Sequence, residues 1–283
     1  MQCRHSFCTR ILCQDSCWKE KHTMRAAELQ DHMRKVGTWV DWERTCDRFI
    51  IGDPETEVKG IAVAWQARFA ALREAINRGC NLFVTHEPVF YRHMDDDESV
   101  FTAAHAREKK AFIEENGLVI FRCHDVWDRM PEIGIVDSWA KQLGLSDKLG
   151  GDGFHSVYRS PAAGLRRLAE YVLSKTRDLG QDSVEMVGDP NAVVTNVGIG
   201  CGAITRYETM INLGADAIIG TDDGMSYWSG GSWTLDGGIP LVIVNHCTAE
   251  EPGMRSLAEY IQREFPEVRT EFISQGCMFR TVS

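Results

Sequence analysis

The stretch Leu82-Phe83-Val84-Thr85-His86-Glu87-Pro88 is an apolar run that ends in two potential metal ligands and a proline. The run is short and rich in residues that favour β-structure, and Gly79 stands just before it. This pattern predicts a buried strand of a parallel sheet. Open α/β sheets bind ligands in the crevice beyond the carboxyl ends of their strands, so we expect His86 and Glu87 to face a crevice.

Length and composition place the chain among ordinary globular proteins. Its 283 residues allow one large domain or two smaller ones. A formal charge of -10 and a pI near 5.4 disfavour nucleic-acid binding, which depends on clustered Lys and Arg. No apolar run reaches the roughly 18 residues of a membrane span or forms a secretory signal, so we expect a cytoplasmic protein with no membrane contact.

The 10 cysteines fall into two groups. Those scattered through the body of the chain are typical of buried reduced thiols. The remainder crowd the first 17 residues with the spacing C-x4-C-x4-C-x3-C, whereas zinc sites commonly contain C-x2-C. We predict that residues 1–23 are a disordered or artefactual leader, with a metal site as the alternative, and that Met24 is a candidate initiator.

The chain after Met24 predicts an α/β protein of two related lobes. Lobe one covers about 24–132, a linker region about 133–190 and lobe two about 191–283. A shift of 135 positions lays Gly79 on Gly214, and a shift of 122 lays His124 on His246. Because the shifted segments share the order strand, helix, glycine, strand, we expect two halves packed about a pseudo-twofold axis with a cleft between them.

Potential metal ligands follow the predicted strand ends in both lobes. Five of them are expected to ligate directly and three to lie close behind. The five are His86, Glu87, Asp128, His246 and Glu250, and the three are His124, Asp125 and Asp222. Imidazoles mixed with carboxylates suit zinc, manganese, iron or cobalt, and several carboxylates able to bridge suit a pair of ions that activate water for hydrolysis.

Each residue also has a structural alternative. A single histidine at a strand end is commonly just hydrogen bonded, and an acid near a helix start is commonly a cap. Glu250 and Glu251 precede Pro252 and a helix predicted over 254–265, so they could be such caps.

The motifs together resemble the NGG-one interacting factor three family (Nif-three-like proteins), dinuclear-metal proteins often called GTP cyclohydrolase type 2. The resemblance covers about residues 24–270. It rests on a start near Met24, an Asp47…Gly52-Asp53-Pro54 turn, His-x-Pro at His86–Pro88, H-x3-D at His124–Asp128 and H-x3-E at His246–Glu250. It implies a homohexamer with two metal ions held by His86, the residue at 87, Asp128, His246 and Glu250, a carboxylate bridging the ions.

Three departures from the family pattern bear on function. Glu87 stands where the family usually has a second histidine, which favours manganese or iron while leaving zinc open. Cys46-Asp47-Arg48 replaces Trp-Asp-Asn, and Gln66 replaces an aspartate. The resemblance implies a metal-dependent hydrolase in which a metal-bound hydroxide attacks a nucleotide or related small heterocycle. The alternative is a non-catalytic metal-binding scaffold or a regulatory interaction protein.

Overall fold

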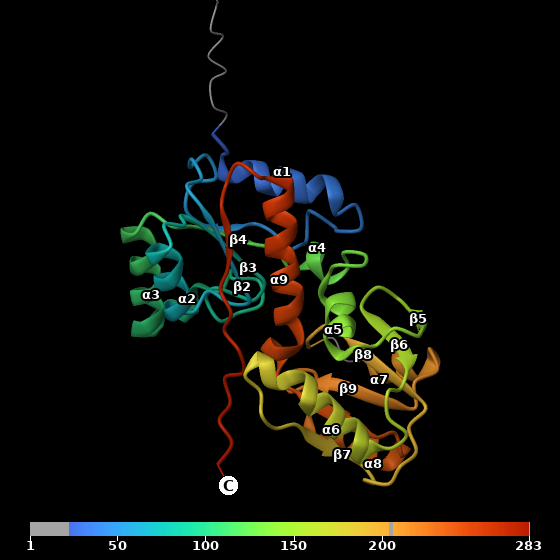
Figure 1. Cartoon of the computed structure of the whole chain (residues 1–283). Helices are drawn as coiled ribbons and strands as arrows, with labels where there is room; N and C mark the ends of the chain where they lie inside the picture. The colour runs from blue at the N-terminus through green and yellow to red at the C-terminus, as the bar shows by residue number, and fades with distance from the viewer. Residues whose placement is uncertain (1–22, 204–205, 283) are drawn as a thin grey trace, which may run out of the picture.

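The structure, a computed structural model, describes residues 23–203 and 206–282. The expected leader lies outside these residues except for Thr23. The described chain forms two β-sheets, with helices on their faces and one long helix running beside both (Figure 1). No helix in the described ranges is long and apolar enough to cross a membrane.

The first sheet contains five strands in the order β1-β4-β3-β2-β11. Its strands are β1 (Phe49–Ile51), β2 (Ile61–Ala64), β3 (Leu82–Thr85), β4 (Val119–Arg122) and β11 (Thr270–Phe272). Strand β3 is parallel to both neighbours, and all four of its residues are buried. The predicted buried parallel strand is therefore confirmed.

Helices cover both faces of this sheet because its strands alternate apolar side chains between the two faces. Ala62 and Phe83 pack with α2 (Phe69–Asn77) and α3 (Ala104–Glu115), which follows the short helix η1 (Glu98–Thr102). Ile61 and Val84 belong to the cluster on the other face. There the helices are α1 (Ala26–Val36) and α9 (His246–Glu264).

The second sheet contains six strands in the order β5-β6-β8-β9-β10-β7. Its strands are β5 (Lys148–Gly151), β6 (His155–Arg159), β7 (Glu185–Val187), β8 (Asn196–Gly200), β9 (Ala217–Thr221) and β10 (Leu241–Val244). The helices that fall between these strands along the chain are α6 (Leu165–Thr176), η2 (Arg177–Leu179), α7 (Tyr207–Asn212), η3 (Tyr227–Ser232) and α8 (Trp233–Gly237). Helix α6 packs on one face, and α7 packs on the other.

The two sheets repeat one topology. Strands β2, β3 and β4 are successive and parallel, and β1 lies antiparallel beside β4. In the second sheet β8, β9 and β10 are successive and parallel, and β7 lies antiparallel beside β10. The predicted α/β fold with two related halves is confirmed.

Residues 133–190 do not form a linker, which corrects the expected lobe boundaries. They supply α5 (Ile135–Leu143), α6 and three of the six strands of the second sheet. Strand β11 meanwhile returns from the end of the chain to pair with β2 in the first sheet. Strand β7 confirms a strand that the sequence predicts over 183–187, whereas β5 lies where a Gly-rich loop is expected, because it is a mostly exposed edge strand with little apolar pattern.

Helix α9 begins earlier than the sequence predicts. It starts at His246, eight residues before the expected helix 254–265, and contains Pro252. Glu250 and Glu251 are thus inside the helix, and the cap interpretation is wrong. Pro252 removes one backbone N–H from the helix, and the packing of α9 against α5, β2 and β11 offsets that loss.

Candidate metal centre

Strand β3 delivers His86 and Glu87 to the edge of the first sheet. Just beyond the strand, the backbone N–H groups of His86 and Glu87 donate to the carbonyl of Trp65 at 3.1 and 2.8 Å. The His86 ring is fully buried, and its Nδ1 lies 3.1 Å from the carbonyl oxygen of Cys123. That contact makes Nδ1 the donor, so Nε2 is left as the atom that can bind a metal ion.

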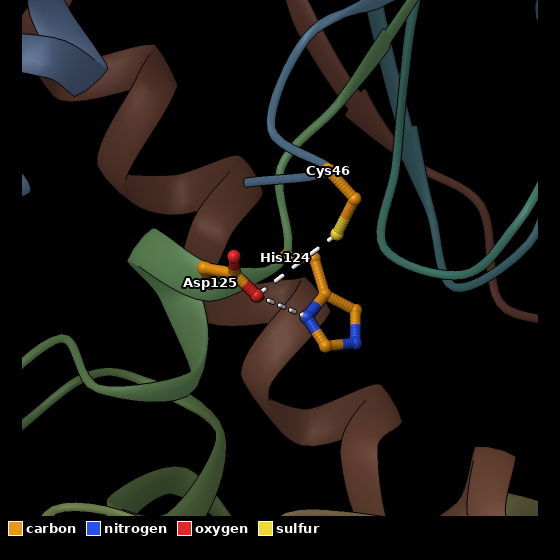
Figure 2. A group of neighbouring side chains, drawn as sticks. All are labelled: Cys46, His124 and Asp125. Carbon is orange, nitrogen blue, oxygen red and sulfur yellow. Dashed lines mark hydrogen bonds and ion pairs between the residues drawn. The ribbon is translucent and has the colours of Figure 1, made fainter. Parts of the chain in front are cut away.

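Helix α4 (Asp125–Asp128) follows β4 and places the first pair of site residues, His124 and Asp128. The buried carboxylate of Asp47 accepts the backbone N–H groups of His124, Asp125 and Val126 at 2.7, 2.8 and 2.9 Å. These bonds satisfy donors that the start of a helix leaves unpaired. The His124 Nδ1 then lies 3.1 Å from Asp125 Oδ1 (Figure 2) and 3.3 Å from Asp128 Oδ2.

Helix α9 follows β10 in the same way and places the second pair of site residues, His246 and Glu250. The side chain of Asp222 accepts the backbone N–H of His246 at 2.6 Å. One turn of helix brings His246 and Glu250 together, with Nε2 and Oε2 3.0 Å apart. Asp223 Oδ2 lies 2.7 Å from His246 Nδ1, which fixes the ring with Nε2 toward Glu250.

Two of the groups of three ligand atoms share Glu250, and a further group joins His86, Glu87 and His124. In the first group, His86 Nε2 lies 3.4 Å from Asp128 Oδ1 and 3.5 Å from Glu250 Oε2. In the second, His246 Nε2 lies 3.5 Å from Glu87 Oε1 and 3.0 Å from Glu250 Oε2. Within each group the ligand atoms lie within 4.8 Å of one another, so either group could hold an ion.

Two further observations fit a pair of cations. His86 Nε2 and Asp128 Oδ1 are buried and make no hydrogen bond to the described residues, a state that costs roughly 1–3 kcal/mol for each unsatisfied group. A Cβ built on Gly202 would lie 2.0 Å from His246 Nε2 and 2.2 Å from Glu250 Oε1. The absence of a side chain at Gly202 therefore keeps the space beside the ligand atoms open.

The charges in the cluster also favour bound cations. Burial lowers the pKa of His86 and of His246, but the carboxylate of Glu250 and its neighbours outweigh burial and raise both pKa values well above 6.5. Burial raises the pKa of Glu250, but the two imidazoles hold it well below its usual value. Protons and metal ions therefore compete for the same imidazole nitrogens.

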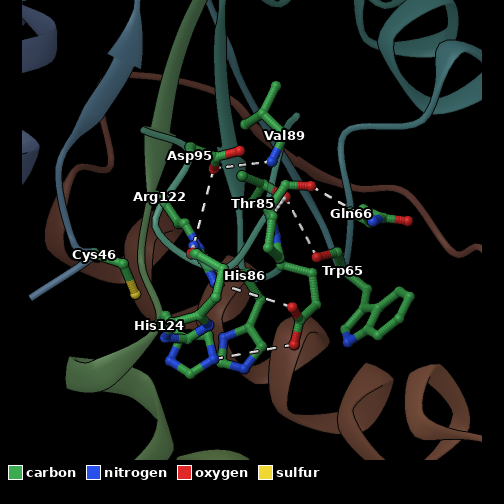
Figure 3. Close-up of polar contacts among 12 residues, drawn as sticks. Cys46, Trp65, Gln66, Thr85, His86, Val89, Asp95, Arg122 and His124 are labelled. Carbon is green, nitrogen blue, oxygen red and sulfur yellow. Dashed lines mark hydrogen bonds and ion pairs between the residues drawn. The ribbon is translucent and has the colours of Figure 1, made fainter. Parts of the chain in front are cut away.

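Arg122 supports the loop that carries Glu87. Its buried guanidinium donates from Nε to the His86 carbonyl at 2.8 Å and also donates to the carbonyl of His93. One of its terminal nitrogens lies 3.9 Å from Glu87 Oε2, and another lies 3.9 Å from Asp95 Oδ2 (Figure 3). These contacts place Glu87 at the cleft edge, with its side chain 14% exposed.

A cleft opens over the two groups. Its volume is about 540 Å³, within the roughly 300–1,000 Å³ typical of small-molecule sites. Glu87, Asp128, His246 and Glu250 line it. The thiol of Cys201 also lines it and donates to the carbonyl of Asp128, while burial raises the pKa of that thiol well above its usual value.

The structure brings all five expected ligands together. The three residues expected close behind them have different positions. His124 lies in the cleft with Nε2 4.0 Å from Glu87 Oε1, and Asp125 holds its other nitrogen. Asp222 caps α9, whereas the imidazole of His246 is held by Asp223, which the sequence analysis did not select. The only signal for Asp223 was its place beside Asp222 after the strand.

Trp65 was also missed. Its indole Nε1–H donates to Glu250 Oε2 at 2.7 Å and so orients the carboxylate that both groups share. It stands at the end of β2, directly after four buried residues, where its apolar ring gave no sign of a role in the site.

These features define a two-lobed α/β protein whose cleft could hold divalent cations between its halves. The sequence model of the Duf34/NIF3 (NGG1p interacting factor 3) family matches residues 28–276, so the chain belongs to that family. The resemblance stated from the motifs is thereby confirmed.

Relatives and solved structures agree with this assignment. Proteins named GTP cyclohydrolase 1 type 2 homolog are 25% identical over 240 residues in Chlamydia pneumoniae (81% of this chain, 89% of the relative) and 23% over 237 in Clostridium perfringens (79% and 85%). Staphylococcus aureus protein SA1388 superposes with a TM-score of 0.77 at 17% identity, covering 92% of this chain and 100% of that one. A Bacillus cereus protein related to NIF3 gives 0.75 at 14%, covering 92% and 99%. At these identities the solved structures establish the fold alone.

Proposed function

We propose that this protein is a metal-dependent hydrolase with two divalent ions, acting on a nucleotide or a related heterocycle. The observation that supports the proposal is the position of Glu250 in two of the ligand groups, where its carboxylate could bridge two ions. The names of the relatives, GTP cyclohydrolase 1 type 2 homolog, support the substrate class.

The chain's own side chains divide the work. His86, Asp128 and Glu250 would hold one ion, and Glu87, His246 and Glu250 the other. Zinc, manganese and iron all suit this donor set, and its three carboxylates favour the harder ions. Two ions held so close supply Lewis acidity, which lowers the pKa of water and stabilises negative charge on an attacked centre. Asp223 is hydrogen bonded to His246, and Trp65 donates to Glu250, so these two residues orient the proposed ligands.

His93 supplies a further polar group at the cleft. Its ring contacts that of His124 edge to face, with ring centroids 5.7 Å apart. Burial, together with the charge of Arg122, lowers the pKa of His93, so its imidazole is neutral near pH 7. A neutral imidazole at that position can accept a proton from the reacting groups and return it to the product.

The test couples metal analysis with turnover. Protein loaded separately with zinc, manganese and iron would be assayed against nucleotides, phosphoesters and cyclic amides, with bound metal measured by elemental analysis. We expect hydrolysis that depends on metal. His246→Ala should lose metal and activity while keeping its circular dichroism spectrum, and His105→Ala, on the exposed side of α3, should keep all three.

Metal-replete protein that hydrolyses nothing in this screen would contradict the proposal and favour a non-catalytic metal-binding scaffold. The homohexamer and the cytoplasmic location stay predictions. Analytical ultracentrifugation tests the first. The exposed side chains of Tyr227 and Trp228 offer apolar surface for contact with a second copy.

A further inference from the structure

A further group of side chains that could ligate a metal ion lies beside the cleft. It consists of Cys46, His124 and Asp125, whose ligand atoms lie within 4.8 Å of one another. Cys46 comes from the loop before β1, and the other two come from the start of α4 (Figure 2). Neither of the groups that share Glu250 contains a cysteine.

The spacing of these atoms suits a tetrahedral ion. Asp125 Oδ1 lies 3.9 Å from Cys46 Sγ and 3.1 Å from His124 Nδ1. Ligands bound to zinc at about 2.0–2.3 Å in tetrahedral geometry are about 3.3–3.7 Å from one another. The distances from Asp125 Oδ1 lie close to that range, so these three side chains could take three of the four positions, and solvent could take the fourth.

The surroundings hold this group in place. The Thr45 hydroxyl donates to Asp125 Oδ2 at 2.7 Å, which leaves Oδ1 directed at Cys46 and His124. The same hydroxyl accepts the backbone N–H of Asp47 at 2.9 Å. The Asp47 carboxylate accepts the backbone N–H groups of His124, Asp125 and Val126. It therefore fixes the backbone that carries two members of the group. Supporting bonds of this kind are typical of metal ligands.

His124 faces two clusters with its two ring nitrogens. Nε2 points to Glu87 at 4.0 Å, whereas Nδ1 points to Asp125 and Asp128. Cys46 is 1% exposed, but the side chain of Asp125 is 42% exposed. An ion can therefore reach Nδ1 from the Asp125 side without passing through the cleft.

We propose that Cys46, His124 Nδ1 and Asp125 form a third cation site that takes a thiophilic divalent ion such as zinc. The Cys46 thiol loses its proton to solvent as its sulfur binds the ion, and the thiolate and the Asp125 carboxylate balance the charge of the ion. A sulfur donor favours zinc or cobalt over manganese, so the third site differs in preference from the oxygen-rich pair. The proposal does not depend on hydrolysis.

Cobalt tests it because thiolate ligation to Co²⁺ gives a charge-transfer absorption in the near ultraviolet. Titration of the metal-free protein with Co²⁺ should produce that band. Cys46→Ser should abolish the band and lower bound zinc by one equivalent, and Asp125→Asn should weaken zinc binding by about 10-fold or more. Glu250→Gln should keep the band although it removes the shared ligand of the other two groups.

The matched control is Cys201→Ser, which removes the thiol that lines the cleft and should leave the band intact. Wild-type protein that shows no band at saturating Co²⁺ would overturn the proposal. A band that survives Cys46→Ser, or that disappears in Cys201→Ser, would also overturn it. Because none of these readouts is enzymatic, a failed activity screen leaves the outcome for the third site unaffected.

Discussion

Helices α4 and α9 carry the same spacing of histidine and acid, yet they differ in length and in support. Helix α4 has 4 residues and depends on three hydrogen bonds to Asp47. Helix α9 has 19 residues and packs against α5, β2 and β11. A short helix held by one carboxylate and a long helix held by packing therefore place equivalent pairs of histidine and acid at one cleft.

The difference in the acids sets their roles. Glu250 lies in both ligand groups, since its Oε2 is 3.5 Å from His86 Nε2 and 3.0 Å from His246 Nε2. Asp128 has a shorter side chain and lies in only one of these two ligand groups. In the proposed metal centre, the longer helix would supply the bridging carboxylate, and the shorter helix would supply a ligand of one ion.

The largest expected effect comes from Glu250→Gln. This change keeps the size of the side chain and an acceptor for Trp65, but it removes the charge that both groups share. We expect both ions of the pair to be lost at micromolar metal, with affinity falling by more than about 100-fold, because even supporting residues are worth about 10–100-fold. Elemental analysis after gel filtration measures the loss.

Glu251→Gln is the matched control on the same helix. Glu251 accepts the backbone N–H groups of Gln275 and Gly276 and does not line the cleft. We expect it to keep both ions. Metal retained in Glu250→Gln, or lost equally in both variants, would contradict the bridging role.

Asp128→Asn should cost one ion where Glu250→Gln costs two. Only the group of His86, Asp128 and Glu250 loses a carboxylate. The group of Glu87, His246 and Glu250 keeps all its ligands. Calorimetric titration with Mn²⁺ should show one binding event in place of two, since the proposed third site disfavours manganese. Loss of both events would show that the two groups bind as one unit.

The sequence predicted the parts of the site that rest on simple periodicity. Strand β3 was identifiable because it is buried on both faces, and strand ends of a parallel sheet meet at one edge. The five expected ligands therefore came from the spacing of His86, Glu87 and the two helical pairs.

The parts that were missed depend on tertiary contacts. Edge strand β5 gains its order from pairing with β6. Helix α9 contains Pro252 because surrounding packing offsets a broken hydrogen bond. Asp222 and Asp223 are adjacent acids in a turn, and only the path of the backbone decides that Asp223 reaches His246 while Asp222 caps the helix.

The two capping carboxylates should differ in their effect on stability. Asp47→Ala removes three charged hydrogen bonds from a helix with few other contacts, and we expect the free energy of unfolding to fall by about 2–3 kcal/mol. Asp222→Ala removes bonds to the His246 backbone and to Asn245, and we expect about 1 kcal/mol because packing holds α9. Urea denaturation of metal-free protein measures both. Equal losses would show that α4 is held by more than Asp47.

The smallest effect concerns the pH dependence of α4. Burial raises the pKa of Asp125, but hydrogen bonds from His124 and Thr45 outweigh it and lower the pKa to about 2. A depressed carboxyl pKa stabilises the fold above its unfolded value near 3.8, and this stabilisation is lost as the pH falls toward 2. Because the side chain is partly exposed, screening limits the effect to less than about 1 kcal/mol.

Asp125→Asn should therefore destabilise metal-free protein at pH 6 and do so less at pH 3, as followed by urea denaturation at both values. Thr45→Val removes only one of the two hydrogen bonds and should show a smaller change over the same range. A difference between wild type and Asp125→Asn that is the same at both pH values would mean that His124 is held by Asp128 alone. In that case His124 would resemble His246 more closely, because one acid would hold its Nδ1.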